Sequence, residues 1–313
     1  MTPSSPRAAL LERPLPSFSS PLHRNIETMS THHHRNAGLT LLLAMLAGCG
    51  GSAPPPAAEP EPVVRSEPEP APVEPTPDPE PPPPPAVAVT LGESTPIEGA
   101  MPTLRITAPR NGATVRTGNV NVRVTLRNWE LAAPEGAHVH LILDDEPYIA
   151  IRDVGSPIDL NALVQAELGH ELTEGTHVLR MFPSRGHHES VKDAGAFAMV
   201  TFHYRSATEG FEFDASAPLL TYSRPKGCNP LGERVLLDFF VTNATLAEGG
   251  TRVRWMLDGT PGEIATWAPH HIENLGAGAH ELRLTLIDEG GTPIPGRFND
   301  VSRAFTVADH CPE

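Results

Sequence analysis

The stretch that decides the fold is Val139-His140-Leu141-Ile142-Leu143-Asp144-Asp145, which lines up with Val253-Arg254-Trp255-Met256-Leu257-Asp258-Gly259 further along the chain. In both segments the first, third and fifth residues are apolar and fall on one side of an extended strand. Each segment ends in acidic or glycine residues that favour a turn. The two segments therefore predict two copies of one strand with a buried face, with Trp255 in the interior of the second copy.

The repeat continues downstream of both segments. Gly175-Thr176-His177-Val178-Leu179-Arg180 lines up with Gly278-Ala279-His280-Glu281-Leu282-Arg283, and each copy closes on an apolar strand, 196–204 and 302–307. Such period-two patterning, interrupted by turns, is typical of antiparallel sheets with one buried face. We therefore expect an all-β protein with two tandem Ig-like antiparallel β-sandwiches, domain 1 over residues 100–207 and domain 2 over 208–313.

Three local features qualify this pattern. One short helix is expected from Asp159, which can cap it, to Leu168. His177 and His280 occupy matching positions at a strand entrance, where a hydrogen bond to the backbone is their expected role. Glu189 and Lys192 are spaced as a loop salt bridge rather than as a catalytic pair.

The motifs resemble those of bacterial extracytoplasmic Ig-like domains. The resemblance rests on Pro109 to Val115, His138 to Asp144 and Leu172 to Leu179, and it covers about two thirds of the chain. The second copy keeps the turn and the later motif but carries arginines in place of the paired histidines (Asp258, Leu275 to Leu282, Arg252, Arg254). The resemblance implies the fold and is compatible with many functions, because such sandwiches host many roles.

The N-terminal region has the features of a targeting signal. The apolar run 39–46 is about half as long as a bilayer-spanning helix needs, and it ends in Leu46-Ala47-Gly48-Cys49. This tetrapeptide resembles the lipobox of bacterial lipoproteins, which implies cleavage before Cys49 and lipidation of that cysteine, including palmitate. We expect residues 1–48 to be a signal peptide, with Met29 as an alternative start. Gly50, where an aspartate would favour retention in the inner membrane, favours the outer membrane.

Residues 49–99 are expected to be the lipidated cysteine followed by a disordered stalk. This segment is rich in Pro, Glu and Ala, and proline both fixes φ and removes a backbone donor. Such chains favour extended polyproline II, which would hold the folded part away from the membrane. The net charge of −15 argues against a nucleic-acid partner, which needs a basic surface.

Three cysteines are present, and Cys49 has the separate fate just described. Cys228 and Cys311 lie near the two ends of domain 2, and an extracytoplasmic compartment favours oxidation. We therefore predict a Cys228–Cys311 disulfide, with two free thiols as the alternative.

The candidate metal ligands are histidines of domain 1. His138 and His140 alternate with Val139 and therefore project from one face of the strand, away from the core. That spacing suits zinc or copper. With Arg180, they are expected to share an exposed sheet face, to which the nearby loop and the last strand could add further ligands (His187, His188, His203). The alternative is that these histidines are merely solvated, and the loop pair His270-His271 is a weaker candidate.

Enzyme signatures are lacking: the sequence has neither a Gly-x-Ser-x-Gly elbow nor a glycine-rich phosphate loop. The sequence therefore favours a membrane-anchored extracytoplasmic lipoprotein that acts as a non-catalytic binding or scaffolding module, without a cofactor. Its partner would be an unidentified protein or glycan of the cell envelope. The alternative is a lipoprotein that binds zinc or copper through the His138 and His140 face, and a hydrolase with an unrecognised site ranks last.

Overall fold

The computed structural model describes residues 86–312, which are almost entirely β-structure. The predicted signal peptide, Cys49 and most of the predicted stalk lie outside the described residues. The nine-residue helix α1 (Leu160–Leu168) begins at Asp159, whose side chain accepts a hydrogen bond from the Ala162 N–H, as the sequence predicted. No helix in the described part of the chain is long and apolar enough to cross a bilayer.

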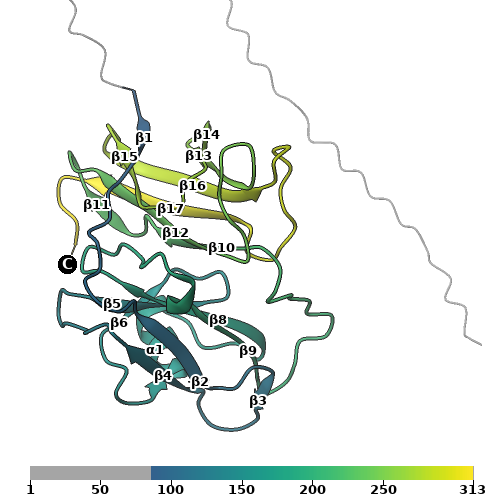
Figure 1. The fold of residues 1–313 in the computed structure, drawn as a ribbon. Coiled ribbons are helices and arrows are strands. Elements are labelled where there is room, and N and C mark those ends of the chain that lie inside the picture. Colours follow the sequence, from purple (N-terminus) through teal and green to yellow (C-terminus); the bar gives the residue numbers. More distant parts are fainter. Residues whose placement is uncertain (1–85, 313) are drawn as a thin grey trace, which may run out of the picture. The chain divides into compact units, whose positions relative to one another are not determined.

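The first sandwich packs a three-stranded sheet, in the order β2-β4-β7, against a five-stranded sheet, in the order β3-β9-β8-β5-β6 (Figure 1). Neighbouring strands are antiparallel except for the β3–β9 pair. Val139, Leu141 and Leu143 lie in its core, as the alternation predicted. The strand bounds are β2 (Thr103–Ala108), β3 (Ala113–Val115), β4 (Asn121–Arg127), β5 (His138–Leu143), β6 (Ile149–Ile151), β7 (Ile158–Asp159), β8 (Gly175–Ser184) and β9 (Ala198–Tyr204).

The second sandwich repeats this arrangement with the sheets β1-β15-β12-β10 and β11-β17-β16-β13-β14 (Figure 1). Trp255 is buried on β13, and Gly262 of the paired strand lies beneath its indole, where an added Cβ would come within 2.1 Å of the ring. The strand bounds are β10 (Leu219–Arg224), β11 (Cys228–Pro230), β12 (Val235–Thr242), β13 (Arg252–Leu257), β14 (Thr260–Ile264), β15 (His270–Glu273), β16 (Gly278–Ile287) and β17 (Asp300–Ala308). The two sandwiches confirm the predicted fold class.

The repeat is also reproduced at the level of hydrogen bonds. His177 Nδ1 lies 2.6 Å from the Asp144 carboxylate and Nε2 lies 2.8 Å from the Thr173 carbonyl oxygen. His280 makes the same two contacts, to Asp258 at 2.6 Å and to the Gly276 carbonyl at 2.9 Å. The predicted backbone hydrogen bonds are therefore confirmed, and an aspartate that the sequence placed only in a turn also holds each ring.

Strand β1 (Ala88–Leu91) corrects the predicted stalk, which was expected to extend to residue 99. It pairs antiparallel with β15 at the edge of a sheet of the second sandwich, and Val89 packs against that sandwich's core. The cause is the local sequence. Alternating residues, some of them β-branched, follow the proline run, and such residues favour a strand that adds to an open edge of a sheet. The predicted loop pair His270-His271 is likewise corrected, since both residues lie in β15.

The second sandwich covers the outer face of the β3-β9-β8-β5-β6 sheet. The prediction that the histidines lie on an exposed face is therefore wrong. The ring of Phe182 stacks on that of Phe240, with centroids 5.0 Å apart, and both side chains are fully buried. Arg180, only 2% exposed, donates hydrogen bonds across the interface to the Leu220 carbonyl (3.3 Å) and the Thr221 hydroxyl (3.0 Å). The two sandwiches therefore share a buried interface.

An ion pair closes the same interface. Lys192 does not pair with Glu189, as the sequence suggested, but with Asp238 of β12. Glu189 instead accepts a hydrogen bond from Arg185 and contacts His187. The sequence could not distinguish these pairings, because Lys192 finds its partner on the other sandwich.

Candidate metal centre

Strand β5 places His138 and His140 on the face that meets the second sandwich. The strand pairs His140 with Phe182 and His138 with Ser184 on β8, so the two imidazoles project beside each other. Neither residue is exposed to solvent. The predicted alternation is therefore confirmed, but the environment is a buried interface rather than water.

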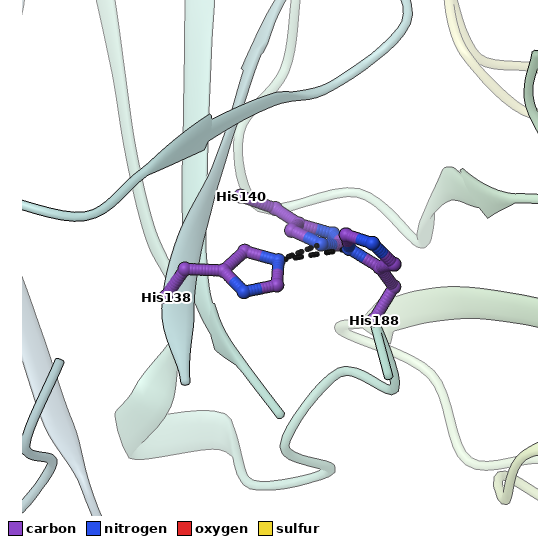
Figure 2. Close-up of side chains that lie close together, drawn as sticks. All are labelled: His138, His140 and His188. Carbon is purple, nitrogen blue, oxygen red and sulfur yellow. Dashed lines mark hydrogen bonds between the residues drawn. The ribbon is translucent and has the colours of Figure 1, made fainter. Parts of the chain in front are cut away.

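The third histidine comes from the loop that follows β8. An isolated bridge between Ser184 and Ser190 closes this loop at its base, and a turn hydrogen bond joins the His188 N–H to the Arg185 carbonyl at 2.9 Å. His188 has φ of 70°, a left-handed conformation that a non-glycine residue adopts only under local constraint. The turn directs the His188 side chain back toward β5 (Figure 2).

The three rings converge on one point (Figure 2). His138 Nε2 lies 3.0 Å from His140 Nε2 and 3.0 Å from His188 Nδ1, and one nitrogen from each ring lies within 4.8 Å of the others. Nitrogens bound to one zinc or copper ion at about 2.0–2.1 Å are separated by about 3 Å or more. The two separations of 3.0 Å are therefore compatible with ligands around a single ion.

In His138 and His140, the ring nitrogen that points away from the common point has a hydrogen-bond partner. That partner bears on which nitrogen carries the proton and which is free to bind a metal. His138 Nδ1 lies 2.7 Å from the Gly136 carbonyl oxygen, which can only accept, so this nitrogen carries the proton. His140 Nδ1 lies 3.1 Å from the Ser223 hydroxyl oxygen, which can accept its proton. When the hydroxyl accepts that proton, both Nε2 atoms have a lone pair directed at the common point, and such outer partners typically orient metal-binding imidazoles.

Burial keeps the imidazoles neutral. Desolvation is the main cause that lowers the pKa of His138 and lowers that of His140 well below its usual value. Desolvation, followed by the charge of Arg224, lowers the pKa of His188 to about 3. Neutral imidazole is the form that binds a metal.

Tyr148 forms one wall of the site. Its ring stacks on His140 with centroids 3.6 Å apart and planes 8° apart, and it is 2% exposed. Burial raises the pKa of its hydroxyl far above the usual value. Tyr148 therefore acts as a neutral aromatic wall that fixes the orientation of His140.

The other predicted ligands lie elsewhere. His187 is exposed on the same loop and contacts Glu189 at 2.9 Å. His203 shares the sheet face with His138 but pairs with Thr176, whereas His138 pairs with Ser184. These positions are eight residues apart on β8, about 26 Å at 3.3 Å per residue. Of the predicted ligands, which all lie among residues 86–312, only His188 joins the two strand histidines.

Ser223 and Tyr148 were not anticipated from the sequence. Ser223 belongs to β10 of the second sandwich, and nothing in the sequence links it to β5. Tyr148 immediately precedes β6, the strand paired with β5, so its position beside His140 could have been found from the hairpin between them. The missing information was the contact between the sandwiches.

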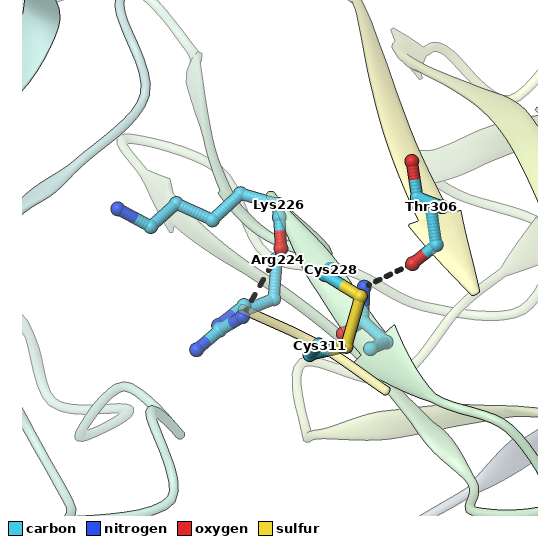
Figure 3. Close-up of a disulfide and its surroundings, with 6 residues drawn as sticks. Arg224, Lys226, Cys228, Thr306 and Cys311 are labelled. Atoms are coloured by element: carbon cyan, nitrogen blue, oxygen red, sulfur yellow. Dashed lines mark hydrogen bonds between the residues drawn. A yellow bond between two sulfur atoms is a disulfide. The ribbon is translucent and has the colours of Figure 1, made fainter. Parts of the chain in front are cut away.

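The predicted disulfide is present, joining Cys228 and Cys311 with 5.4 Å between their Cα atoms (Figure 3). Arg224 and Lys226 lie in the same segment as Cys228, at the end of β10 and just beyond it (Figure 3). The disulfide therefore lies in the segment that follows Ser223, whose hydroxyl contacts His140.

No protein-family model matches the sequence, and no curated protein matches it. Among solved structures, the fibronectin(III)-like modules of Clostridium thermocellum CbhA are 13% identical, with 66% of this chain and 94% of that chain covered and a TM-score of 0.24. CBD12 from CALX1.2 is 10% identical, with 65% and 99% covered and a TM-score of 0.16. Three N-terminal domains of the bacteriophage RB49 outer capsid protein Hoc are 12% identical, with 66% and 69% covered and a TM-score of 0.19. At such scores these likenesses carry no argument, and the fold rests on the strand order and register.

Proposed function

We propose that this chain is a non-catalytic, lipid-anchored module of the cell envelope that binds a zinc or copper ion through His138, His140 and His188. The two sandwiches provide a rigid scaffold, and the ion occupies their interface. The lipid anchor at Cys49, the outer-membrane location and an envelope protein or glycan as further partner are part of this proposal, and they rest on the sequence.

The observation that carries the metal site is the convergence of three imidazole nitrogens with 3.0 Å between neighbouring atoms. With its proton on Nδ1, neutral His138 has one lone pair at Nε2, yet two nitrogens face that atom. A single cation accepts all three lone pairs at once. Imidazole donors suit zinc and copper, whereas magnesium and calcium prefer oxygen.

Stoichiometric metal binding tests the proposal. Protein stripped with a chelator is expected to bind one equivalent of zinc or copper(II) in a dialysis and elemental-analysis experiment. Zinc at about 100 times its dissociation constant should stabilise the fold by about 2.7 kcal/mol. Replacing His138 and His140 together by alanine should abolish both effects.

His187→Ala and His203→Ala are the matched controls, because both histidines belong to the same sandwich but lie outside the cluster. Each should retain one equivalent of metal. A wild-type protein that binds no metal and keeps the same melting temperature in zinc would exclude the site and leave a scaffold without a metal.

The anchor has a separate test. Cells that express the full chain and are fed labelled palmitate should incorporate label into the protein, and Cys49→Ser should remove it and release the protein from the membrane fraction. Label that persists in Cys49→Ser would rule out lipidation at this position.

A further inference from the structure

Three cations surround the histidine cluster without a carboxylate partner among residues 86–312. These cations are Arg152, Arg224 and Lys226, and none of them forms a salt bridge in this range of residues. The Nε atoms of Arg152 and Arg224 are buried and have no hydrogen-bond partner. This is unusual in a chain whose net charge is −15, and buried charges are normally paired.

The fold brings all three cations to the histidines. Strand β6 pairs Ile151 with Val139, so Arg152, the next residue, comes opposite His138 at the sheet edge. Arg224 directly follows Ser223, whose hydroxyl contacts His140. Lys226 Nζ lies 4.0 Å from the centroid of the Tyr148 ring, the ring that also stacks on His140.

A divalent cation alone would add its charge to these three cations, which outnumber Asp238, the carboxylate opposite Arg224 that already pairs with Lys192. An anion bound beside it would offset both the metal and the neighbouring cations. Three protein ligands also leave an open position on zinc or copper for a further ligand. Arginine guanidinium groups bind carboxylates and similar oxyanions in paired geometry.

We infer that the three-histidine centre binds its metal together with a small oxygen-donor anion, such as a carboxylate, held by Arg224 and its neighbouring cations. This inference rests on the proposed metal site and names its co-ligand. Burial lowers the pKa of Lys226 to about 8, with Arg224 adding to the effect, and its Nζ donates a hydrogen bond to the Tyr148 carbonyl at 2.8 Å. Metal and anion should then strengthen each other's binding by the same factor.

The experiment is a zinc titration of the full mature protein in sodium acetate and in sodium perchlorate of equal ionic strength, with acetate as the probe. Acetate is expected to tighten zinc binding by at least about fivefold, the lower end of typical coupling between sites. Equal ionic strength removes general screening as the cause.

Arg224→Gln is expected to lose the gain from acetate and, in perchlorate, to bind zinc at least as tightly as the wild type, because one repelling charge is gone. Lys226→Gln should show the same trend and serves if Arg224→Gln does not fold. Arg283→Gln is the matched control, since Arg283 already pairs with Asp300 on β17 and is exposed. It should keep the full response to acetate.

The outcomes separate the two claims. Zinc that binds equally well in both salts would overturn the anion inference and leave the metal site intact. An acetate effect that survives Arg224→Gln and Lys226→Gln would also overturn it. Absence of zinc binding in either salt would refute the metal site itself.

Discussion

Replacing Cys228 and Cys311 together by serine is expected to lower the free energy of unfolding by about 4 to 5 kcal/mol. The bridge spans 83 residues, and the enclosed chain holds every strand of the second sandwich from β12 to β17. In the chain-entropy description, the loss comes from the greater freedom of the unfolded chain. Urea unfolding followed by tryptophan fluorescence measures it.

The structure gives this bridge a local role as well. Strand β11 has only three residues and pairs in parallel with the end of β17, so besides the bridge this edge of the sheet is held by a short ladder and by flanking backbone hydrogen bonds of Leu231 and Thr306. Wild-type protein treated with dithiothreitol should reproduce the loss and separates the missing bond from the effect of the serines. A difference below about 1 kcal/mol would show that the unfolded chain is already constrained there.

Much of the fold could be predicted from single strands. The alternation of Val139, Leu141 and Leu143 identifies a core face whatever covers the other side, and the structure confirms it. The helix cap at Asp159 and the paired Cys228 and Cys311 were also found, because each depends on residues with a local or chemical signature.

The environment of the site could not be predicted in the same way. Alternation shows which residues point away from the core, but a second domain decides whether that face meets water. A signal was present, because β5 and β8 carry apolar residues on the outward positions as well, such as Ile142, Val178 and Phe182. Strands that are apolar on both faces are typical of sheets covered on both sides.

The contribution of His188 illustrates the same limit. The sequence made His188 a candidate metal ligand only because a histidine pair occupies the loop after β8. Only the turn geometry decides that His188 reaches His138 while His187 points to solvent and contacts Glu189. A shift of one residue in that loop would exchange the two rings, and the sequence does not specify the shift.

Replacing Lys192 by methionine is expected to cost about 3 to 5 kcal/mol of stability, the usual effect of leaving a buried charge without its partner. Asp238 is 0% exposed, and without the ammonium its carboxylate would keep only the backbone N–H of Ser190, 3.3 Å away. Calorimetry should show this loss as a lower melting temperature, because the pair joins the loop after β8 to β12.

The double variant Lys192→Met with Asp238→Asn tests whether the unpaired carboxylate causes this loss of stability. If the loss comes from the uncompensated carboxylate, removing that charge should recover at least half of the stability, and the double variant should be more stable than Lys192→Met alone. If the lysine acts mainly by packing its aliphatic chain, the double variant should be as unstable as the single one or worse. Recovery would show that the ion pair itself gives little net stability and that the loss in Lys192→Met comes from the buried carboxylate left without its partner.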